Sequence, residues 1–267
     1  MSTVGGVYRE TPPPAALRGL VECAWSTTGG PGGRVLPDGC MDLLLSPDGT
    51  VSVAGPDTAA FVVTGSAEWT AGVRFHPDAL PRLLGVPAVE VRDLRAPVET
   101  IAPGPASLVQ PLRSAGASAG SGGRARRRGT ARGPAVGDPA ATAPDLMLDA
   151  VARLVAEAPE KRETAPWSLP ALAHVTRRLG GGARVEDLAD ELGWSPRSLT
   201  RQCTAVFGYG PATLRRILRF RRAGNLLHAG VAPAEVAAVT GYADQPHLAR
   251  EVKALAGVPA SALRGPE

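Results

Sequence analysis

The sequence predicts an α+β protein of two domains: a small N-terminal antiparallel β-barrel or sandwich, and an all-α C-terminal domain that carries two helix-turn-helix units. Short apolar segments follow one another about every ten residues in the first hundred residues, which favours strands. Near the other end, a glycine-aromatic turn between two short amphipathic helices occurs twice. With 44% hydrophobic residues in a chain of 267, both domains have enough apolar side chains for a core.

The first domain is predicted to cover residues 1–112. Its apolar segments alternate with turn residues, and Pro47-Asp48-Gly49 provides a tight turn between two of the strands. A short helix follows from Pro77 to Leu84. The predicted strands are residues 20–26, 41–46, 50–54, 60–64 and 70–76.

Residues 113–144 are predicted to be a flexible linker, because Ala, Gly, Ser, Pro and Arg leave too few apolar side chains to offset the entropy of ordering. Residues 145–166 follow as a connecting amphipathic helix with Leu146, Val151 and Leu154 on one face. This helix either packs on the β domain or forms a dimer, and a helix of this length rarely holds a dimer alone. We therefore favour packing.

The C-terminal domain, residues 167–267, contains the first helix-turn-helix pattern. Gly193 allows the positive φ that ends a helix, Ser195 provides an N-cap, and Pro196 occupies the first turn of the next helix. The buried face of the first helix is predicted from the spacing of Val185, Leu188, Ala189 and Leu192, and that of the second from Leu199, Cys203 and Val206.

The same pattern returns about fifty residues later. Gly241 and Tyr242 form the turn, either Asp244 or Gln245 caps the second helix, and Pro246 lies in its first turn. Residues 211–227 between the two patterns are predicted to form one longer connecting helix. Two such units joined by a helix are typical of DNA-binding proteins.

Residues 170–264 resemble the DNA-binding domain of the AraC/XylS family of transcription regulators. The resemblance is carried by Val185-Glu-Asp-Leu-Ala, Gly193-Trp-Ser-Pro-Arg-Ser-Leu-Thr-Arg, Arg219-Phe-Arg-Arg-Ala, Gly241-Tyr and Gly257-Val-Pro. It implies that both units enter the major groove of one DNA segment. This chain departs from the family pattern at Gln202, Cys203 and Val252, which are smaller or more polar, and at Ala249, which offers no polar group to a base.

The N-terminal region resembles an uncharacterised domain that precedes such DNA-binding domains in regulators of GC-rich, actinobacterial-type genomes. The resemblance is carried by Val35-Leu-Pro-Asp-Gly-Cys-Met-Asp-Leu-Leu-Leu and by Gly72-Val-Arg-Phe-His-Pro. Sensor domains of this family are often cupin-like barrels, so the resemblance implies a small effector bound in the N-terminal domain.

The outer face of the second helix in each unit supplies the predicted DNA contacts. Arginines pair with guanine, Gln245 suits adenine, and Thr200 can touch a thymine methyl group, whereas other contacts reach only phosphate. The predicted DNA-binding residues are Ser195, Arg197, Ser198, Thr200, Arg201, Gln245, His247 and Arg250. No catalytic residue is predicted.

Polar residues among the predicted strands are the candidates for the effector site: Asp42, Arg74 and His76. An alternative is a metal site that combines Asp38 or Asp42 with Cys40 and His76, although no spacing enforces one. A simpler alternative is an Arg74–Asp42 pair across strands with His76 capping the next helix. A catalytic Cys40 activated by His76 is a further alternative.

Composition and charge limit the function classes. The three cysteines form no C-x-x-C pair, which disfavours a disulfide framework or structural zinc, and no apolar run reaches the roughly 18 residues of a membrane span. The N-terminus lacks the pattern of a signal peptide, so we expect a cytoplasmic protein. Residues 167–267 hold 13 basic residues against 8 acidic ones, whereas residues 1–112 hold 7 against 11, which places the attraction for phosphate in the helical domain.

The sequence therefore predicts a sequence-specific DNA-binding transcription regulator, modulated by a small effector at the N-terminal domain, with no enzymatic activity, cofactor or metal. Its predicted partners are double-stranded DNA, a small-molecule effector and RNA polymerase, with no membrane; monomer and homodimer both remain open. The alternative is an enzyme or DNA-repair protein with a DNA-targeting helix-turn-helix module. A weaker alternative is an N-terminal domain that binds a protein partner. The operator, the effector and the direction of regulation are not encoded in these patterns.

Overall fold

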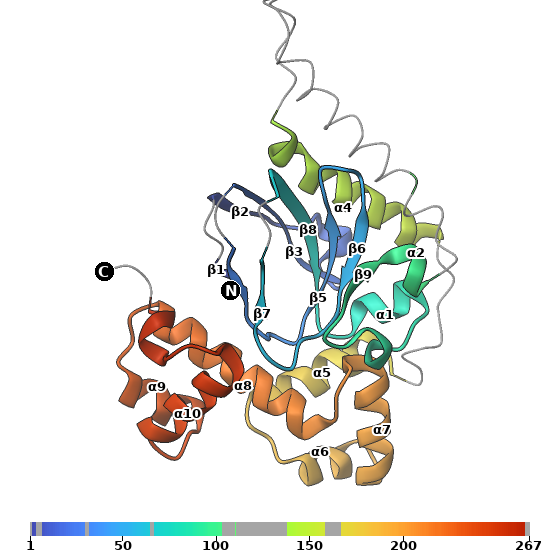
Figure 1. Ribbon diagram of the computed structural model, residues 1–267. Helices are drawn as coiled ribbons and strands as arrows, with labels where there is room; N and C mark the ends of the chain where they lie inside the picture. Colours follow the sequence, from blue (N-terminus) through green and yellow to red (C-terminus); the bar gives the residue numbers. More distant parts are fainter. Residues whose placement is uncertain are drawn as a thin grey trace, which may run out of the picture.

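The computed structural model describes residues 2–3, 7–29, 32–64, 67–102, 110, 138–157 and 167–264. Within these residues, an antiparallel β domain is followed by a helical domain, and the two lie against each other (Figure 1). The predicted α+β class with an N-terminal β domain and an all-α C-terminal domain is confirmed. Most of the predicted linker, residues 113–137, lies outside the described residues, as do residues 158–166.

The main sheet has the strand order β2-β3-β8-β5-β6-β9, and each neighbouring pair is antiparallel. Among the described strands, its edges β2 and β9 do not pair with each other, so this sheet is open rather than closed on itself. Its strands are β2 (Val7–Thr11), β3 (Val21–Thr28), β5 (Met41–Leu45), β6 (Val51–Ala54), β8 (Trp69–Phe75) and β9 (Arg95–Pro97).

A smaller sheet has the order β1-β4-β7, with strands β1 (Ser2–Thr3), β4 (Arg34–Val35) and β7 (Phe61–Val62). Four of the predicted strands correspond to β3, β5, β6 and β8. The predicted strand over residues 60–64 shortens to β7 and joins the smaller sheet, so the strand segments divide between two sheets.

The two faces of the main sheet differ in chemistry because side chains alternate along each strand. On β8, Ala71, Val73 and Phe75 are fully buried in the apolar core, whereas Arg74 lies on the opposite face. Gly72 shares the face of Arg74, and a Cβ there would lie 2.5 Å from the indole ring of Trp25. The close approach of β3 and β8 therefore requires glycine at this position.

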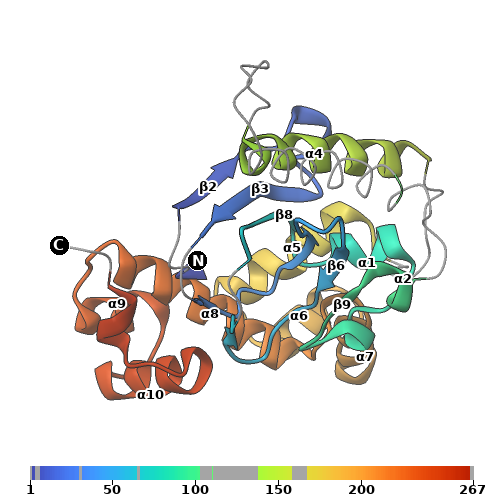
Figure 2. The ribbon, with the colours of Figure 1, turned by 45° about the horizontal axis from the view of Figure 1, so that its top comes forward.

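Helix α4 (Pro139–Glu157) lies across the apolar face of the main sheet (Figure 2). Its buried side chains, among them Met147, Val151 and Leu154, belong to the same core as those of β8. Helix α4 therefore packs on the β domain, as predicted. The helix begins at 139, six residues earlier than predicted, because Asp138 caps its first turn through a bond to the amide of Ala140 (3.1 Å).

Short helical segments complete the β domain. The predicted helix after β8 is α1 (Ala79–Leu84), which packs into the core beside η1 (Ala15–Leu17). The segments η2 (Ala88–Val91) and α2 (Val98–Ile101) follow on either side of β9.

Helices α5 to α10 build the C-terminal domain around two separate cores, and α8 contributes to both. Leu214, Ile217 and Leu218 of α8 pack with the first core, and Phe220 and Leu227 pack with the second. The helices are α5 (Leu169–Gly180), α6 (Val185–Glu191), α7 (Pro196–Phe207), α8 (Pro211–His228), α9 (Pro233–Thr240) and α10 (Gln245–Ala256), followed by η4 (Ala260–Leu263).

Asp78 is a buried carboxyl at the junction of β8 and α1. It adopts φ 120°, which is rare for a residue other than glycine, and its side chain forms no capping hydrogen bond to α1. Burial raises the pKa of the Asp78 carboxyl to about 8, although the positive charge of Arg82 acts in the opposite direction. Asp78 is therefore protonated in the folded protein at neutral pH.

We predict a pH-dependent loss of stability from this group. Between the ordinary aspartate pKa of about 4 and a pH of about 8, the unfolded chain has an ionised Asp78 and the folded protein a protonated one, so the free energy of unfolding falls as pH rises. Asp78→Asn stays neutral in both states. In urea unfolding at several pH values across this range, wild type should lose stability relative to Asp78→Asn as pH rises. Parallel stability curves for the two proteins would contradict the prediction.

Candidate nucleic-acid interface

The first helix-turn-helix unit consists of α6 and α7. Gly193 has φ 65° in the turn, and the Ser195 hydroxyl accepts a hydrogen bond from the backbone amide of Ser198 (3.2 Å) at the start of α7. Leu199 and Cys203 of α7 are completely buried in the first core. The turn, the cap and the inward face therefore lie where the sequence places them.

The outward face of α7 presents Arg197, Thr200 and Arg201 to solvent. Among the described residues, neither arginine forms an ion pair or a side-chain hydrogen bond. Ser195 and Ser198 differ from them because their hydroxyl oxygens lie 3.0 Å apart and bond to each other at the cap. The polar side chains that this face of α7 projects into solvent are thus those of the two arginines and the threonine, while the two serines bond to each other at the helix end.

The second unit repeats this arrangement with α9 and α10. Gly241 has φ 75° in the turn, and Asp244 caps α10 by accepting a bond from the amide of His247 (2.6 Å), which resolves the choice between Asp244 and Gln245. Gln245 and Arg250 are exposed on the outer face of α10.

The imidazole ring of His247 is held by contacts within the protein. Its Nδ1 accepts a hydrogen bond from the amide of Ala243 (3.3 Å), and its ring lies edge-on to Tyr242 with centroids 5.2 Å apart. Ala249 is exposed but has no polar group. The second unit therefore offers fewer hydrogen-bonding side chains on its outer face than the first.

Arginines of α8 attach the second unit to this helix. Arg216 forms two hydrogen bonds to Glu251 of α10 (2.7 and 3.1 Å), and these bonds lower the pKa of the Glu251 carboxyl. The guanidinium of Arg219 lies over the ring of Tyr242, 4.3 Å from its centroid, and donates to the carbonyl of Gly241 (3.4 Å). These contacts fix α10 relative to α8, and sequence analysis did not find them because they join residues far apart in the chain.

The first unit is held by apolar packing. The rings of Trp167 and Trp194 stack with centroids 5.2 Å apart, and Phe207 lies beside Trp167 at 6.4 Å. Arg215 of α8 adds a bond to the carbonyl of Ala183 (3.4 Å). The units lie at opposite ends of α8, whose 18 residues span about 27 Å at 1.5 Å per residue (Figure 1).

Comparison with known proteins finds a family match for each of the two domains. Residues 188–265 match the family model of an AraC-type helix-turn-helix domain, and residues 9–97 match a domain of unknown function, DUF6597. The C-terminal part of the chain therefore carries an AraC-type helix-turn-helix domain. This assignment confirms the resemblance seen in the sequence for each of its two parts.

Individual proteins resemble this chain over a short segment or at low sequence identity. An uncharacterised HTH-type transcriptional regulator of Bacillus subtilis, YbfI, is 36% identical over 64 residues, which are 24% of this chain and 23% of that protein. This chain thus matches about a quarter of the length of that curated relative. Structures of ToxT from Vibrio cholerae are similar at TM-scores of 0.45 and 0.41, with 8% and 10% identity over 96–98% of this chain and 94–97% of theirs.

Two of the three candidate effector-binding residues are engaged with each other. Asp42 and Arg74 face each other across β5 and β8, and Arg74 donates to both carboxylate oxygens at 3.3 and 3.4 Å. Asp38 lies 3.6 Å from the same guanidinium. The expected cross-strand pair is therefore present, in a buried cluster of two carboxylates around one arginine.

Burial and charge act differently on the two carboxyls. Burial raises the pKa of Asp42 despite its bond to Arg74. Burial also opposes ionisation of Asp38, but the charges of Arg74 and Arg221 hold its pKa below the ordinary value. The cluster thus depends on a second arginine, Arg221, which comes from α8.

His76 does not join this cluster. It follows the last residue of β8, and its Nε2 lies 3.2 Å from the carbonyl oxygen of Arg18, whereas Asp78 occupies the N-cap position of α1. The expected capping by His76 is therefore wrong. In the part of the chain that the structure describes, no group of three or more His, Cys, Asp or Glu side chains is placed to hold a metal ion.

Cys40 has the environment of a structural thiol. Burial raises its pKa well above the ordinary value, and its Sγ donates to Glu22 (3.2 Å). Cys23 and Cys203 are also buried, as expected of small core residues. None of the described helices is long and apolar enough to cross a membrane.

The two helix caps give a direct stability test. Asp244→Ala removes the acceptor for the His247 amide and should cost about 0.5–2 kcal/mol of unfolding free energy. Asp244→Asn keeps a good N-cap and should cost much less. Urea unfolding of the two variants measures the difference, and an equal loss in both would contradict a capping role.

Proposed function

We propose that the chain is a sequence-specific DNA-binding transcription regulator whose two helix-turn-helix units read adjacent major grooves of one duplex. The observation that carries this proposal is the exposure of Arg197 and Arg201 on α7 and of Gln245 and Arg250 on α10, at opposite ends of one helix. Successive major grooves on one side of B-DNA are about 34 Å apart. The roughly 27 Å of α8, extended by the widths of the flanking units, suits that separation.

Within this proposal the polar residues divide by role. Arg197, Arg201 and Arg250 are positioned for guanine edges, Gln245 for an adenine edge, and Thr200 for a thymine methyl group. For Ser195, Ser198 and His247, bonds within the protein leave backbone phosphate as the natural contact. RNA polymerase remains a candidate partner on the same promoter.

The domain boundaries enter the proposal with one change. We assign the sensor domain to residues 1–112 and include α4 in it, because α4 shares its core. Residues 113–137 form the proposed linker, and residues 167–267 form the DNA-binding domain. A small effector bound to the sensor domain then modulates DNA binding. Asp42 and Arg74 bond to each other and are buried, so we assign this pair a structural role and do not place it in the effector site.

Selection of binding sites from random DNA by the purified protein tests the proposal. Arg201→Ala combined with Arg250→Ala should weaken binding to the selected site by about thirtyfold or more, since each of the two bidentate base contacts contributes roughly 1–3 kcal/mol. Arg153→Ala, on α4 at the far side of the β domain, removes one charge as a control and should leave affinity unchanged.

A fall of affinity with rising salt accompanies any phosphate contact, so the wild type should lose affinity steeply between about 50 and 200 mM salt. Absence of sequence preference in the wild type would contradict the proposal. A double variant that no longer binds DNA while a catalytic activity persists would favour a DNA-targeted enzyme instead.

Effector binding has its own test. A ligand that binds the folded protein raises its melting temperature by mass action. In a thermal-shift screen against metabolites, at least one compound should stabilise the full chain and change its affinity for the selected site. A screen without any stabilising compound would count against a sensing role for the N-terminal domain.

A further inference from the structure

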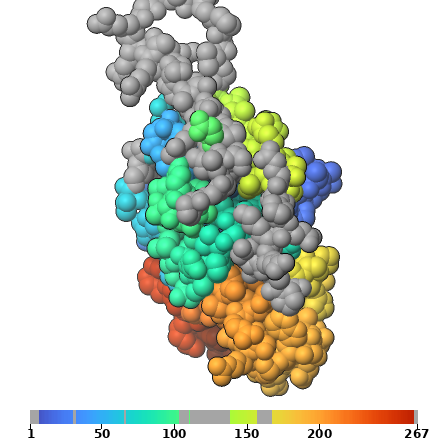
Figure 3. Space-filling model, turned by 90° about the vertical axis from the view of Figure 1, so that its right-hand side faces the viewer, coloured from blue at the N-terminus to red at the C-terminus, as the bar shows by residue number. Residues whose placement is uncertain are grey.

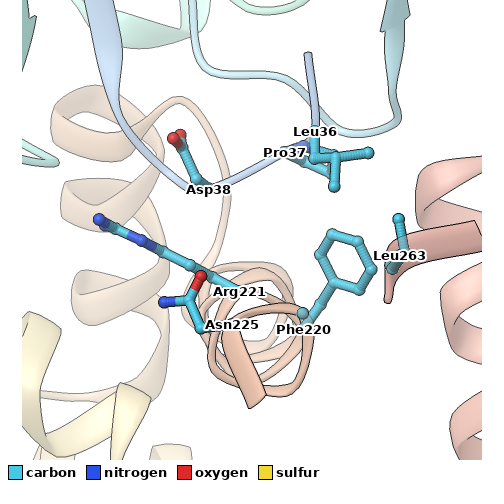
Figure 4. A pocket seen from close by; sticks show the side chains of 8 residues that line it. Leu36, Pro37, Asp38, Phe220, Arg221, Asn225 and Leu263 are labelled. Carbon is cyan, nitrogen blue, oxygen red and sulfur yellow. The ribbon is translucent and has the colours of Figure 1, made fainter. Parts of the chain in front are cut away.

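In the described part of the chain, contacts at three places join the sensor domain to the DNA-binding domain. The first is the loop Leu36–Cys40, which crosses α8 between the two cores. Leu36 is buried in the second core beside Phe220 and Leu263 (Figure 4). At the other end of the loop, Gly39 has φ 84°, and a Cβ there would meet Leu218 and Tyr209 at 3.6 Å. The loop therefore contacts both units at once.

Charge reinforces this contact. Arg221 of α8 extends below Asp38 and donates to Glu22 and to the Sγ of Cys40 (3.5 Å) (Figure 4). The Glu22, Asp38 and Asp42 carboxyls thus share two guanidinium groups, those of Arg74 and Arg221. Because only Arg221 comes from the DNA-binding domain, it is the charge that ties α8 to the sensor domain.

The other two contacts lie at the C-terminal ends of α7 and α10. Arg92, next to η2, donates to the carbonyl of Gly208 (3.1 Å), the residue that ends α7. The space-filling view shows the segment that contains η2 directly on the first unit (Figure 3). Near β7, the amide of Ala60 donates to the carbonyl of Leu255 in the last turn of α10 (2.7 Å).

These contacts leave the proposed reading residues uncovered, because those residues lie in the N-terminal halves of α7 and α10. We propose that docking of the sensor domain fixes the relative placement of the two units. In this proposal Arg221 is the positioning residue, and its contact with Glu22 and Cys40 is called the joint. The docked sensor domain preorganises the pair of units for one spacing between half-sites on DNA. The inference rests on the proposed reading of one duplex by both units.

Preorganisation predicts a specific defect when the joint is loosened. If the arrangement of the two units that can bind the site falls to about a third of the population, the apparent affinity falls about threefold. If it falls to about a tenth, the apparent affinity falls about tenfold. A mobile pair of units also tolerates altered spacing, because one inserted base pair rotates one half-site by about 34° around the duplex. Loosening should therefore weaken binding at the preferred spacing and reduce the penalty for an insertion.

The test uses the full chain and the site selected by the wild type, together with versions that carry one base pair inserted or removed between the half-sites. Arg221→Gln should lower affinity for the parent site three- to tenfold and shrink the insertion penalty at least threefold. Glu22→Gln removes the partner from the sensor side without altering the DNA-binding domain, and it should give the same pattern.

Arg222→Gln is the matched control, since it removes an exposed charge from the next position of α8. It should leave the insertion penalty unchanged. Calorimetric unfolding provides a readout without DNA: the Arg221 and Glu22 variants should separate the domains into two transitions relative to wild type.

Three results would overturn the proposal. They are an unchanged insertion penalty in both joint variants, a penalty that shrinks equally in the Arg222 control, and tighter binding of the joint variants to the parent site, which would make the joint inhibitory. A wild type without any sequence preference would instead refute the proposed function, so the two failures are distinguishable.

Discussion

The arrangement of this protein depends on the burial of α8 on three sides. Its apolar residues complete the first core near its N-terminus and the second core near its C-terminus, and Arg221 on a third side joins the carboxylates of the sensor domain. Each core is small and would lose a substantial part of its buried surface if α8 moved away. A change in the orientation of α8 would therefore move both helix-turn-helix cores and the contact with the sensor domain as well.

Electrostatics at the joint follows from the same burial. Glu22, Asp38 and Asp42 approach one another because two arginines lie among them, and a carboxylate removed from water needs such a partner. Removal of either arginine leaves at least one of these carboxyls without the guanidinium that contacts it. Desolvation of the ions offsets much of their attraction, so the cluster adds less to stability than its number of ion pairs suggests.

The features that were predictable from the sequence are those encoded locally. Gly193 and Gly241 mark the turns because only a residue without Cβ adopts a positive φ without strain, and the spacing of Leu199 and Cys203 marks an inward face. The Asp42–Arg74 pair was also within reach as an alternative, because neighbouring antiparallel strands place opposite residues together. The first turn of α4 was missed because its buried residues are alanines, whose composition resembles that of the linker.

The joint was out of reach for a different reason. Arg221 and Glu22 are 199 residues apart in the sequence, and Arg92 and Gly208 are 116 apart, so no periodicity or motif connects them. The loop Leu36–Cys40 belongs to a segment that resembles a known domain, but its sequence gives no sign that Leu36 completes a core in another domain. Local sequence patterns define each domain by itself, whereas these contacts depend on how the two folded domains pack against each other.

The two units also differ in how they are supported, and this difference bears on how an effector signal would be divided between them. The first unit is stabilised by stacked aromatic rings and contacts the sensor domain through the end of α7. The second is held by Arg216 and Arg219 of α8 and receives a buried side chain, Leu36, from the sensor domain. A shift of the Leu36–Cys40 loop would therefore displace a buried side chain from the core of the second unit, whereas the same loop only lies beside Leu218 and Tyr209 of the first core, at Gly39. Under the proposed function, the second unit, which also presents fewer polar side chains on its outer face, is the unit whose contribution to DNA binding the sensor domain would alter more easily.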